Sequence, residues 1–392
     1  MCAMPGKNPF RPGVGLRPVF LAGREGESRR FGAALRSAPE IPANFTLTGL
    51  RGVGKTALLT ELTEVARGSG WAASQVELEP RHNGEVQLVT LIADVCAALM
   101  NEMERSRKVR KALGRATQHV EVSFGDLKIG FVRGPSESTE DVARLLFDTV
   151  KSATDVGHHG VALLLDEAQV IRDDPKRADF PLSTLLAAVT ALQREQVPVS
   201  LSLCGLPPLK TNLLDARTYA ERMFRGEEVG SLGADDARAA FVEPLRGTLV
   251  TYEDDLVERV VVEVDGYPYF IHLWGAELWD AAEAADVQHF DSALLDAVEP
   301  GIYQRLDRDF YDPRVAALTP AEQDLLLDTA ECVYPPLVVA DLHKASPKTK
   351  QNVNVLLGRI ANAGVIYRIK KGQNEYTAPR FHEYLVRRIG NR

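Results

Sequence analysis

The sequence predicts an α/β fold in which a parallel sheet covered by helices is followed by a helical segment and a small C-terminal domain. Three observations lead to this prediction. Short apolar runs alternate with helical patterns up to about residue 232, as in sheets whose parallel strands are connected by helices. Helical patterns alone dominate residues 233–315. Residues 316–392 read as helices and one hairpin, with many basic side chains.

Composition limits the classes of protein to consider. The 392 residues are 45% hydrophobic and 26% charged, which is ordinary for two or three globular domains. A net charge of −8 argues against general attraction to nucleic acid or anionic membranes. The four cysteines are scattered and form no zinc pattern, which indicates reduced thiols. Neither an apolar run of about 18 residues nor a signal-peptide core is present, so we expect a cytoplasmic chain and no membrane partner.

The first half of the core follows an irregular arm, residues 1–18. We expect the core to span residues 19–232, with a turn at Gly23 before the first helix. The elements expected next are a strand at 45–48, a helix at 55–67, a strand at 71–79 and a helix at 86–100 that is apolar on almost every face. Residues 101–135 lose this pattern and are interpreted as an insertion with a hairpin near Gly125-Asp126.

The second half of the core continues the alternation. A helix begins at Ser138, which Asp141 supports as a capping residue. An apolar run at 161–169, a helix at 182–196, an apolar run at 197–205 and a helix at 209–224 follow. The helical segment 233–315 comes next, and Thr319, Pro320 and Glu322 then occupy the N-cap, N1 and N3 positions of a new helix.

The turn "GLRGVGKT" fits the pattern G-x-x-x-x-G-K-[ST] and lies between a predicted strand and a predicted helix. Gly49, Gly52 and Gly54 allow backbone N–H groups to point at phosphates, and the helix N-terminus adds positive potential. Lys55 would reach the γ-phosphate, and the Thr56 hydroxyl would coordinate Mg²⁺. The alternative is a chance glycine turn. The context of strand and helix favours a P-loop that binds ATP with Mg²⁺.

The run "VALLLDEAQ" predicts the second part of the same site. An apolar strand that ends in two acids places Asp166 at the carboxyl edge of the sheet, where it would hold the water shell of Mg²⁺. Glu167 would polarise an attacking water. A strand that ends in acids by chance is the alternative, and the upstream phosphate loop argues against it.

The quoted motifs together resemble a known family. "FLAGREGE", "GLRGVGKT", "LLLDEAQ", "GLPPL", "YAERMF" and "DGYPYFIHL" follow the order found in AAA+ ATPases of the origin-recognition and STAND groups. This resemblance implies a P-loop NTPase core, a helical lid at 233–315 and a nucleotide-dependent homo-oligomer. It also implies that Arg24 borders the adenine, that Pro268 is the lid contact, and that Arg222 reaches a neighbouring subunit's γ-phosphate, with Arg225 as the substitute.

The chain departs from the origin-recognition pattern at two places. Pro268 and Tyr269 stand where a lid arginine is expected, and the strand "SLSLCG" offers only Ser202 or Cys204 as a polar sensor. The lid therefore resembles the STAND version, which favours a slow nucleotide-dependent switch over fast hydrolysis.

The C-terminal 316–392 segment resembles a winged helix-turn-helix domain. Residues 343–392 hold eleven Lys or Arg against two Glu, a local net charge of +9. The second helix would present Lys348, Lys350 and Asn354, and the hairpin would present Arg368, Lys370 and Lys371. Such segregated charge predicts contact with double-stranded DNA. The alternative is a STAND-like signalling switch, in which this domain packs on the nucleotide and the partner is a protein.

Overall fold

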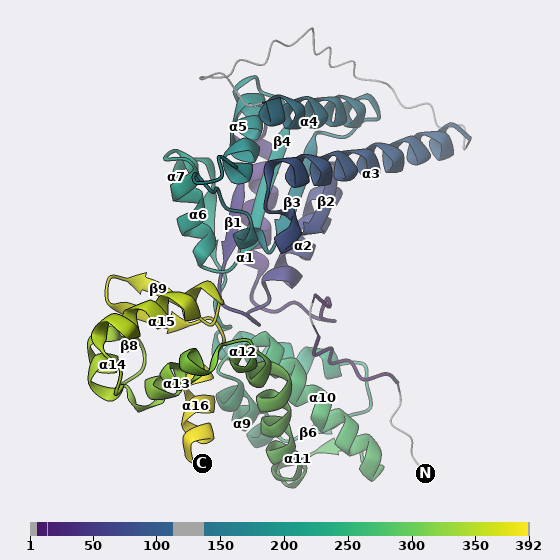
Figure 1. Ribbon diagram of the computed structural model, residues 1–392. Coiled ribbons are helices and arrows are strands. Elements are labelled where there is room, and N and C mark those ends of the chain that lie inside the picture. Colours follow the sequence, from purple (N-terminus) through teal and green to yellow (C-terminus); the bar gives the residue numbers. More distant parts are fainter. Residues whose placement is uncertain (1–5, 14, 113–136, 391–392) are drawn as a thin grey trace. The chain divides into compact units, whose positions relative to one another are not determined.

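The computed structural model describes residues 6–13, 15–112 and 137–390 (Figure 1). These residues divide into two compact units. The core unit comprises residues 23–49 and 55–229, and the C-terminal unit comprises the residues up to 22, the loop 50–54 and residues 230–392. The phosphate loop thus has its first glycine and its Lys-Thr pair in one unit and its middle five residues in the other.

A five-stranded sheet with the order β2-β3-β4-β1-β5 forms the centre of the core unit. Every neighbouring pair in it is parallel, which confirms the predicted fold class. The strands are β1 (Phe45–Thr48), β2 (Ala72–Glu77), β3 (Val161–Asp166), β4 (Val199–Gly205) and β5 (Arg225–Glu228). Strands β1, β3 and β4 are buried at every residue, so both of their faces are covered. Strand β3 is an apolar run, whereas β1 and β4 alternate apolar residues with buried Thr or Ser.

Helices cover this sheet. Its helices are α1 (Glu25–Ser37), α2 (Lys55–Gly68), α3 (Glu85–Ala112), α4 (Glu137–Asp155), α5 (Pro181–Arg194), α6 (Pro208–Ala216) and α7 (Ala220–Met223), with short 3₁₀ turns at Pro80–His82 and Ala168–Val170. Helices α3, α4 and α5 pack side by side (Figure 1). They share one hydrophobic core with β3 and β4, in which Leu88, Leu146 and Leu185 are fully buried.

The core unit differs from the prediction in the helices near residues 209–224, in the strand β5 and in the length of α3. The single helix expected at 209–224 is two helices, α6 and α7, and the strand β5 follows them. Strand β5 is polar and exposed at three of its four residues, because an edge strand needs one partner strand and no buried face. Helix α3 extends to Ala112 instead of ending near residue 100, since its last residues are good helix formers without an apolar stripe. The hairpin predicted near Gly125-Asp126 lies outside the described residues.

Helix α3 is also the one helix among the described residues that is long and apolar enough to cross a membrane, by length and composition. Its Leu88, Ile92 and Cys96 lie in the hydrophobic core of the core unit. A core helix passes the same test, and 33% of this apolar window is buried, where α3 packs against α4.

The C-terminal unit is built mainly from helices around one hydrophobic core. Its first part contains α8 (Ala234–Val242), α9 (Asp254–Val264), α10 (Pro268–Ala285), α11 (Ser292–Arg305), a π-helix (Leu306–Tyr311) and α12 (Asp312–Ala316). A 3₁₀ turn (Glu243–Leu245) and a parallel pair of short strands, β6 (Thr251–Tyr252) and β7 (His289–Phe290), connect them. The buried Trp274 and Tyr384 belong to the same core, so the segments predicted as lid and winged helix pack together.

The remaining elements follow the predicted order. They are α13 (Pro320–Asp328), a 3₁₀ turn (Thr329–Glu331), β8 (Leu337–Val338), α14 (Val339–Ala345), α15 (Lys350–Asn362), β9 (Ile366–Lys370), β10 (Gln373–Tyr376) and α16 (Phe381–Gly390). The capping box of α13 is confirmed, because the Thr319 backbone N–H donates to the Glu322 carboxylate at 2.9 Å. Strands β8, β10 and β9 form an antiparallel sheet in that order.

The described residues of the N-terminal arm, 6–13 and 15–18, form no helix or strand, and the arm is anchored to the C-terminal unit. Phe10 is buried and packs against Phe241 and His272. A Cβ atom added at Gly275 would lie 2.4 Å from the Phe10 ring, so a glycine in α10 makes room for this side chain. Burial, together with the charge of Arg11, lowers the pKa of His272 to about 4.

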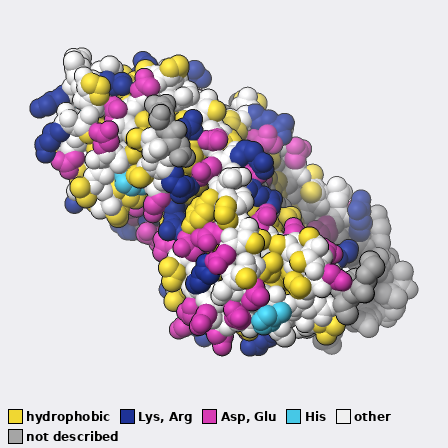
Figure 2. Space-filling model, turned by 90° about the horizontal axis from the view of Figure 1, so that it is seen from below, with side chains coloured by type: hydrophobic (Ala, Val, Ile, Leu, Met, Phe, Trp, Pro, Cys, Tyr) yellow, Lys and Arg dark blue, Asp and Glu magenta, His cyan; other side chains and the backbone are white. Residues whose placement is uncertain are grey.

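The surface mixes charges of both signs. On the face drawn in Figure 2, Lys and Arg side chains are interspersed with Asp and Glu side chains and with hydrophobic groups. No single field of one sign covers that face, as expected for a chain with 46 basic and 54 acidic residues.

Candidate functional site

The predicted magnesium ligands lie together in the core unit. The Thr56 hydroxyl, in the first turn of α2, donates to Asp166 Oδ2 at 2.6 Å. Asp166 ends β3 and its other oxygen, Oδ1, accepts the Glu167 backbone N–H at 2.8 Å. Both Lys55 and Asp166 are buried. A hydroxyl and a carboxylate are oxygen ligands that suit Mg²⁺, so this donor set fits the ion that the sequence predicts.

Glu167 is held in an unusual conformation beside these groups. Its φ of 52° is left-handed, which a residue other than glycine rarely adopts. Gln169 Nε2 donates to Glu167 Oε2 at 2.5 Å, and Gln169 Oε1 accepts the Leu206 backbone N–H at 2.9 Å. A Cβ atom at Gly205 would lie 2.4 Å from Gln169 Oε1. The glutamine therefore ties Glu167 to the end of β4. Sequence reasoning quoted Gln169 without giving it a role.

The structure distinguishes the two predicted polar sensors on β4. Cys204 is fully buried beside Asp166, and burial followed by the negative charge of Asp166 raises the pKa of its thiol. Ser202 is also buried, and its hydroxyl has no hydrogen-bond partner among the described residues. Of the two, Cys204 is the side chain next to the predicted magnesium ligand.

The middle of the phosphate loop lies in the C-terminal unit. Gly52 and Gly54 have φ angles of 81° and 86°, which favour glycine. A Cβ atom at Gly54 would lie 3.7 Å from Pro268 Cγ. The Tyr269 backbone N–H donates to the Gly52 carbonyl at 3.2 Å. The predicted lid residue Pro268 and its neighbour therefore lie against the loop, and two of the loop's glycines have left-handed backbone conformations.

Arg51 connects the same loop to the C-terminal segment. Its backbone N–H donates to the Thr377 carbonyl at 2.9 Å. Thr377 follows β10 directly, and its hydroxyl donates to the Gly364 carbonyl before β9. The loop is thus hydrogen-bonded to the base of the β9–β10 hairpin.

Arg314 is a lid residue that sequence reasoning missed. Its guanidinium carbon lies 4.2 Å from the centre of the Phe310 ring, and Phe310 stacks on Tyr269 at 5.3 Å. Burial and the nearby positive charge of Arg51 lower the pKa of Arg314 to about 10. No motif marks this residue, because an arginine on a helix is ordinary in sequence.

The residues taken from the family resemblance have different surroundings. Arg24 is buried at the start of α1. Arg222, at the end of α7, is exposed and makes no ion pair within the described part of the chain. Arg225 is paired with Glu227 at 3.1 Å, and Glu227 also accepts from Arg30 at 2.8 Å. Of the two arginines considered for contact with a neighbouring subunit's γ-phosphate, Arg222 is therefore the one without an ion pair among the described residues.

The ten described Lys and Arg residues of 343–390 divide into two groups. Five lie within 4.0 Å of a carboxylate: Lys344, Lys348, Arg380, Arg387 and Arg388. Five others are exposed and form no ion pair with any described residue: Lys350, Arg359, Arg368, Lys370 and Lys371. The second group lies on α15 and on the β9–β10 hairpin, which are the two surfaces predicted to meet DNA. Asn354 is likewise exposed on α15.

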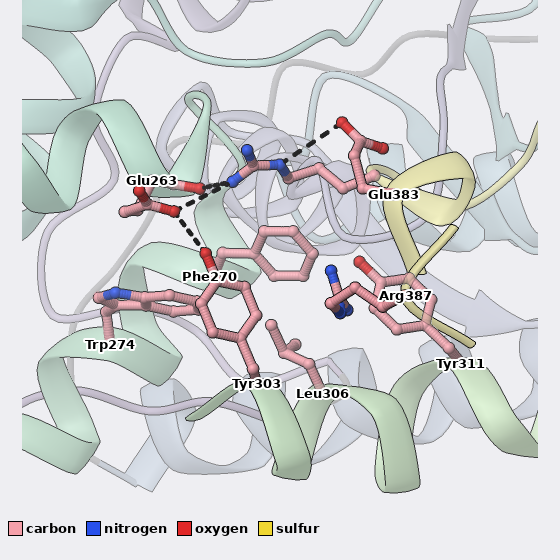
Figure 3. Close-up of a pocket in the computed structure, with 9 residues that line it drawn as sticks. Glu263, Phe270, Trp274, Tyr303, Leu306, Tyr311, Glu383 and Arg387 are labelled. Atoms are coloured by element: carbon pink, nitrogen blue, oxygen red, sulfur yellow. Dashed lines mark hydrogen bonds and ion pairs between the residues drawn. The ribbon is translucent and has the colours of Figure 1, made fainter. Parts of the chain in front are cut away.

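Figure 3 shows a pocket in the C-terminal unit, apart from the phosphate loop. Aromatic side chains of α10 and α11 line it together with charged groups from α9 and α16. Arg380 lies 3.6 Å from a Glu263 oxygen and 3.8 Å from a Glu383 oxygen, and the Tyr303 hydroxyl donates to Glu263 at 2.5 Å. These charges compensate one another, so the pocket joins α16 to the lid helices and is not assigned to a ligand.

Comparisons with known proteins agree with this geometry. The AAA ATPase domain model matches residues 21–202, and a domain of unknown function (DUF8462) matches residues 308–385. No curated protein matches the chain.

Solved structures match over nearly the whole length. The ORC2 protein of Aeropyrum pernix in its ADPNP-ADP complexes has 13% identity and a TM-score of 0.58, over 99% of this chain and 98% of that chain. The Walker-type ATPase PABY2304 of Pyrococcus abyssi has 16% identity and a TM-score of 0.55, over 96% and 98%. The ORC1 protein of Aeropyrum pernix in complex with DNA has 17% identity and a TM-score of 0.50, over 94% of both chains.

At these identities the structural matches establish the fold, and the domain model covers the residues that contain the phosphate loop and the Asp166-Glu167 pair. Both confirm the resemblance that the motifs indicated. Residues 21–202 are therefore similar to the AAA ATPase domain, and the chain has the fold of the solved origin-recognition AAA+ P-loop structures.

Proposed function

We propose that the protein binds ATP with Mg²⁺, hydrolyses it slowly, and couples the nucleotide state to DNA binding or assembly. The observation that supports this best is the Thr56–Asp166 hydrogen bond of 2.6 Å at the start of α2, with Glu167 next in the chain. Bound Mg²⁺ would neutralise phosphate charge in this position. Thr56 and Asp166 would hold the ion and its water shell, and Lys55 would compensate the phosphates.

Glu167 would act as the general base. It would take a proton from a water whose oxygen bonds to the γ-phosphorus while the bond to ADP breaks, so that the products are ADP and phosphate. The hydrogen bond from Gln169 orients the carboxylate. Cys204 in place of a stronger hydrogen-bond donor beside Asp166 supports slow turnover.

DNA is the proposed macromolecular partner. The five exposed basic residues that form no ion pair with any described residue lie on α15 and the adjacent hairpin. Lys and Arg side chains that are not already paired can neutralise phosphates without first breaking an ion pair. In this arrangement the helix would enter the DNA major groove, and the neighbouring hairpin would contact the adjacent phosphates. We infer a cytoplasmic protein that forms a nucleotide-dependent homo-oligomer, in which Arg222 would reach the γ-phosphate bound by a neighbouring subunit.

One observation favours the alternative, a nucleotide-dependent switch with a protein partner. The hydrogen bond from the Arg51 N–H to the Thr377 carbonyl joins the phosphate loop directly to the C-terminal segment. Through this bond a change of the nucleotide in the phosphate loop would change the position of that segment, whether or not the segment contacts DNA.

Two measurements test the proposal. Calorimetric titration should show that wild type binds ATP with Mg²⁺ and that Lys55→Ala does not, since the phosphate charge is then uncompensated; equal affinities would refute the phosphate loop. Gel shifts with duplex DNA, with and without ATP and at two salt concentrations, should show salt-sensitive binding. Nucleotide binding without any DNA shift would leave the protein switch as the function.

A further inference from the structure

Asn44 is a buried polar residue at the start of the central sheet. It lies directly before β1 and is 2% exposed. Its Oδ1 accepts the Leu201 backbone N–H at 2.9 Å and Gln193 Nε2 at 2.8 Å. Its Nδ2 donates to Gln193 Oε1 at 2.9 Å and to the Met223 carbonyl at 3.3 Å. An asparagine amide offers two N–H donors and two acceptor lone pairs, so all of its hydrogen-bonding capacity is used.

One of these four bonds holds the end of α7. This helix has four residues, and a single helical turn is not stable by itself. The Met223 carbonyl belongs to the last turn, where carbonyls need partners outside the helix, and the Asn44 amide is such a partner. The Arg225 backbone N–H also donates to the Asn44 carbonyl, at 2.8 Å. Asn44 therefore fixes the chain both at the end of α7 and at the start of β5.

Arg222 is the residue before Met223 and is exposed on α7. It lies near the amino end of β5, because Arg225 begins that strand. Asp166 lies at the carboxyl end of β3, and all neighbouring strands of the sheet are parallel. Arg222 and Asp166 are therefore at opposite ends of the sheet. Arg222 would reach only a site on another subunit, and its direction depends on what holds α7.

We propose that Asn44 is a positioning residue for Arg222: its amide holds the Met223 carbonyl and thereby sets the direction in which the arginine projects toward the neighbouring subunit. A second contact acts on the same residue, because the Thr190 hydroxyl donates to the Met223 sulfur at 3.5 Å. The inference rests on the proposed role of Arg222, whereas the hold on α7 rests on the hydrogen bonds of Asn44 alone.

Asn44→Ala in the full chain tests this role. Turnover of the assembled protein should fall by about tenfold to a hundredfold, the effect of displacing a reacting group by about 1 Å, while ATP affinity should stay as in wild type. Trypsin should cut after Arg222 severalfold faster, because α7 loses a hydrogen bond that holds it. If Asn44→Ala does not fold, Asn44→Asp serves, since it has the same shape and still accepts from Leu201 but cannot donate to Met223.

Ser200→Ala is the matched control. The buried Ser200 hydroxyl donates to the carbonyl of Ala43, so this variant removes a hydrogen bond next to Asn44 and leaves the bond to Met223 in place. It should change neither the turnover nor the rate of cleavage after Arg222. Equal losses of turnover in Ser200→Ala and Asn44→Ala would overturn the specific role of Asn44.

Subunit mixing separates a misplaced arginine from damage to the variant's own site. Glu167→Gln subunits keep Arg222 and lack the proposed general base, so an excess of them should supply a correctly placed arginine to the sites of Asn44→Ala. Turnover per Asn44→Ala protomer should then recover most of its loss. A rate that stays low on mixing would locate the damage in the variant's own site and overturn the inference.

The outcomes distinguish this inference from the proposed function. If Arg222→Ala loses turnover while folded Asn44→Ala hydrolyses ATP as wild type does, the role of Asn44 is wrong and the arginine between subunits stands. If Arg222→Ala itself hydrolyses ATP at the parent rate, the arginine between subunits is wrong, and the role of Asn44 fails with it.

Discussion

The side-chain amide of Gln169 donates a hydrogen bond of 2.5 Å to the carboxylate of Glu167. The same glutamine accepts the Leu206 backbone N–H and leaves no room for a side chain at Gly205. The side-chain amide of Asn212 on α6 donates to the backbone carbonyl of Gln169 at 3.0 Å. The predicted general base is therefore positioned by the end of β4 and by α6, and not by its own strand alone.

Gln169→Ala should lower ATP turnover by about tenfold to a hundredfold, because a general base displaced by about 1 Å loses that much. ATP affinity should stay unchanged, since Gln169 does not touch the predicted phosphate ligands. Single-turnover hydrolysis and calorimetry on the same samples separate the two effects. Gln351→Ala, at an exposed position of α15, is the control. A turnover that rises would mean that Gln169 restrains Glu167 instead of orienting it.

Glu167→Gln should retain ATP binding and lose at least about a hundredfold in turnover, because the amide can hydrogen-bond water but cannot take up its proton. Phosphate release measured at saturating ATP checks this. Glu64→Gln is the matched control, since Glu64 is an exposed glutamate paired with Arg67 on α2. Hydrolysis at the parent rate would remove Glu167 from the mechanism.

Arg222→Ala should lower turnover by about a thousandfold in an assembled protein, the effect of losing an arginine that completes a neighbour's site. The rate per protomer of wild type should rise with protein concentration, and ATP affinity should not change in the variant. Arg225→Ala is the control, because Arg225 is already paired with Glu227. A rate per protomer that is flat on dilution, in a protein that light scattering shows to be monomeric, argues for a self-contained switch.

The sheet could be predicted from sequence wherever burial covers both faces of a strand. Strand β3 is an apolar run for that reason, and β1 and β4 are built from apolar residues and small or β-branched polar ones. The exposed edge strand β5 carries Arg, Gly and two Glu and has no such pattern. The Lys55, Thr56 and Asp166 site follows from a motif with fixed spacing. The position of Arg314 could not be predicted this way, since it depends on stacking between segments distant in sequence, Tyr269 and Phe310.

His272 predicts a pH dependence of stability. Its pKa is about 4 in the folded protein against an ordinary value of 6.5, so between these values the unfolded state binds more protons. The free energy of unfolding should therefore be highest above pH 6.5 and fall by about 3 kcal/mol on acidification to pH 4. Urea unfolding followed by tryptophan fluorescence at several pH values checks this against His272→Gln, which should lose that part of the slope. Identical slopes in the two proteins would contradict the burial of a neutral imidazole.

Substitutions on the two proposed DNA surfaces, the hairpin and α15, should change DNA binding in different ways. Lys370 and Lys371 are exposed at the hairpin turn without acidic partners among the described residues, so they would contact phosphates. Replacing both with alanine should weaken binding to all duplexes alike and flatten the salt slope by roughly one unit for each lost contact. Asn354 is exposed on α15, where an amide can reach a base edge, so Asn354→Ala should relax sequence preference and leave the salt slope unchanged.

Lys344→Ala is the matched control for the hairpin, because Lys344 carries the same charge but is paired with Asp341 at 2.9 Å on α14. A phosphate contact by Lys344 would first have to break that pair, so its loss should change neither the affinity nor the salt slope. Gel shifts of the full chain with ATP at several salt concentrations measure all three variants. If all three variants bind as wild type does, or if wild type itself shows no salt-dependent shift, α15 and the hairpin are packing surfaces. The Arg51–Thr377 hydrogen bond would then transmit the nucleotide state to the segment that meets a protein partner.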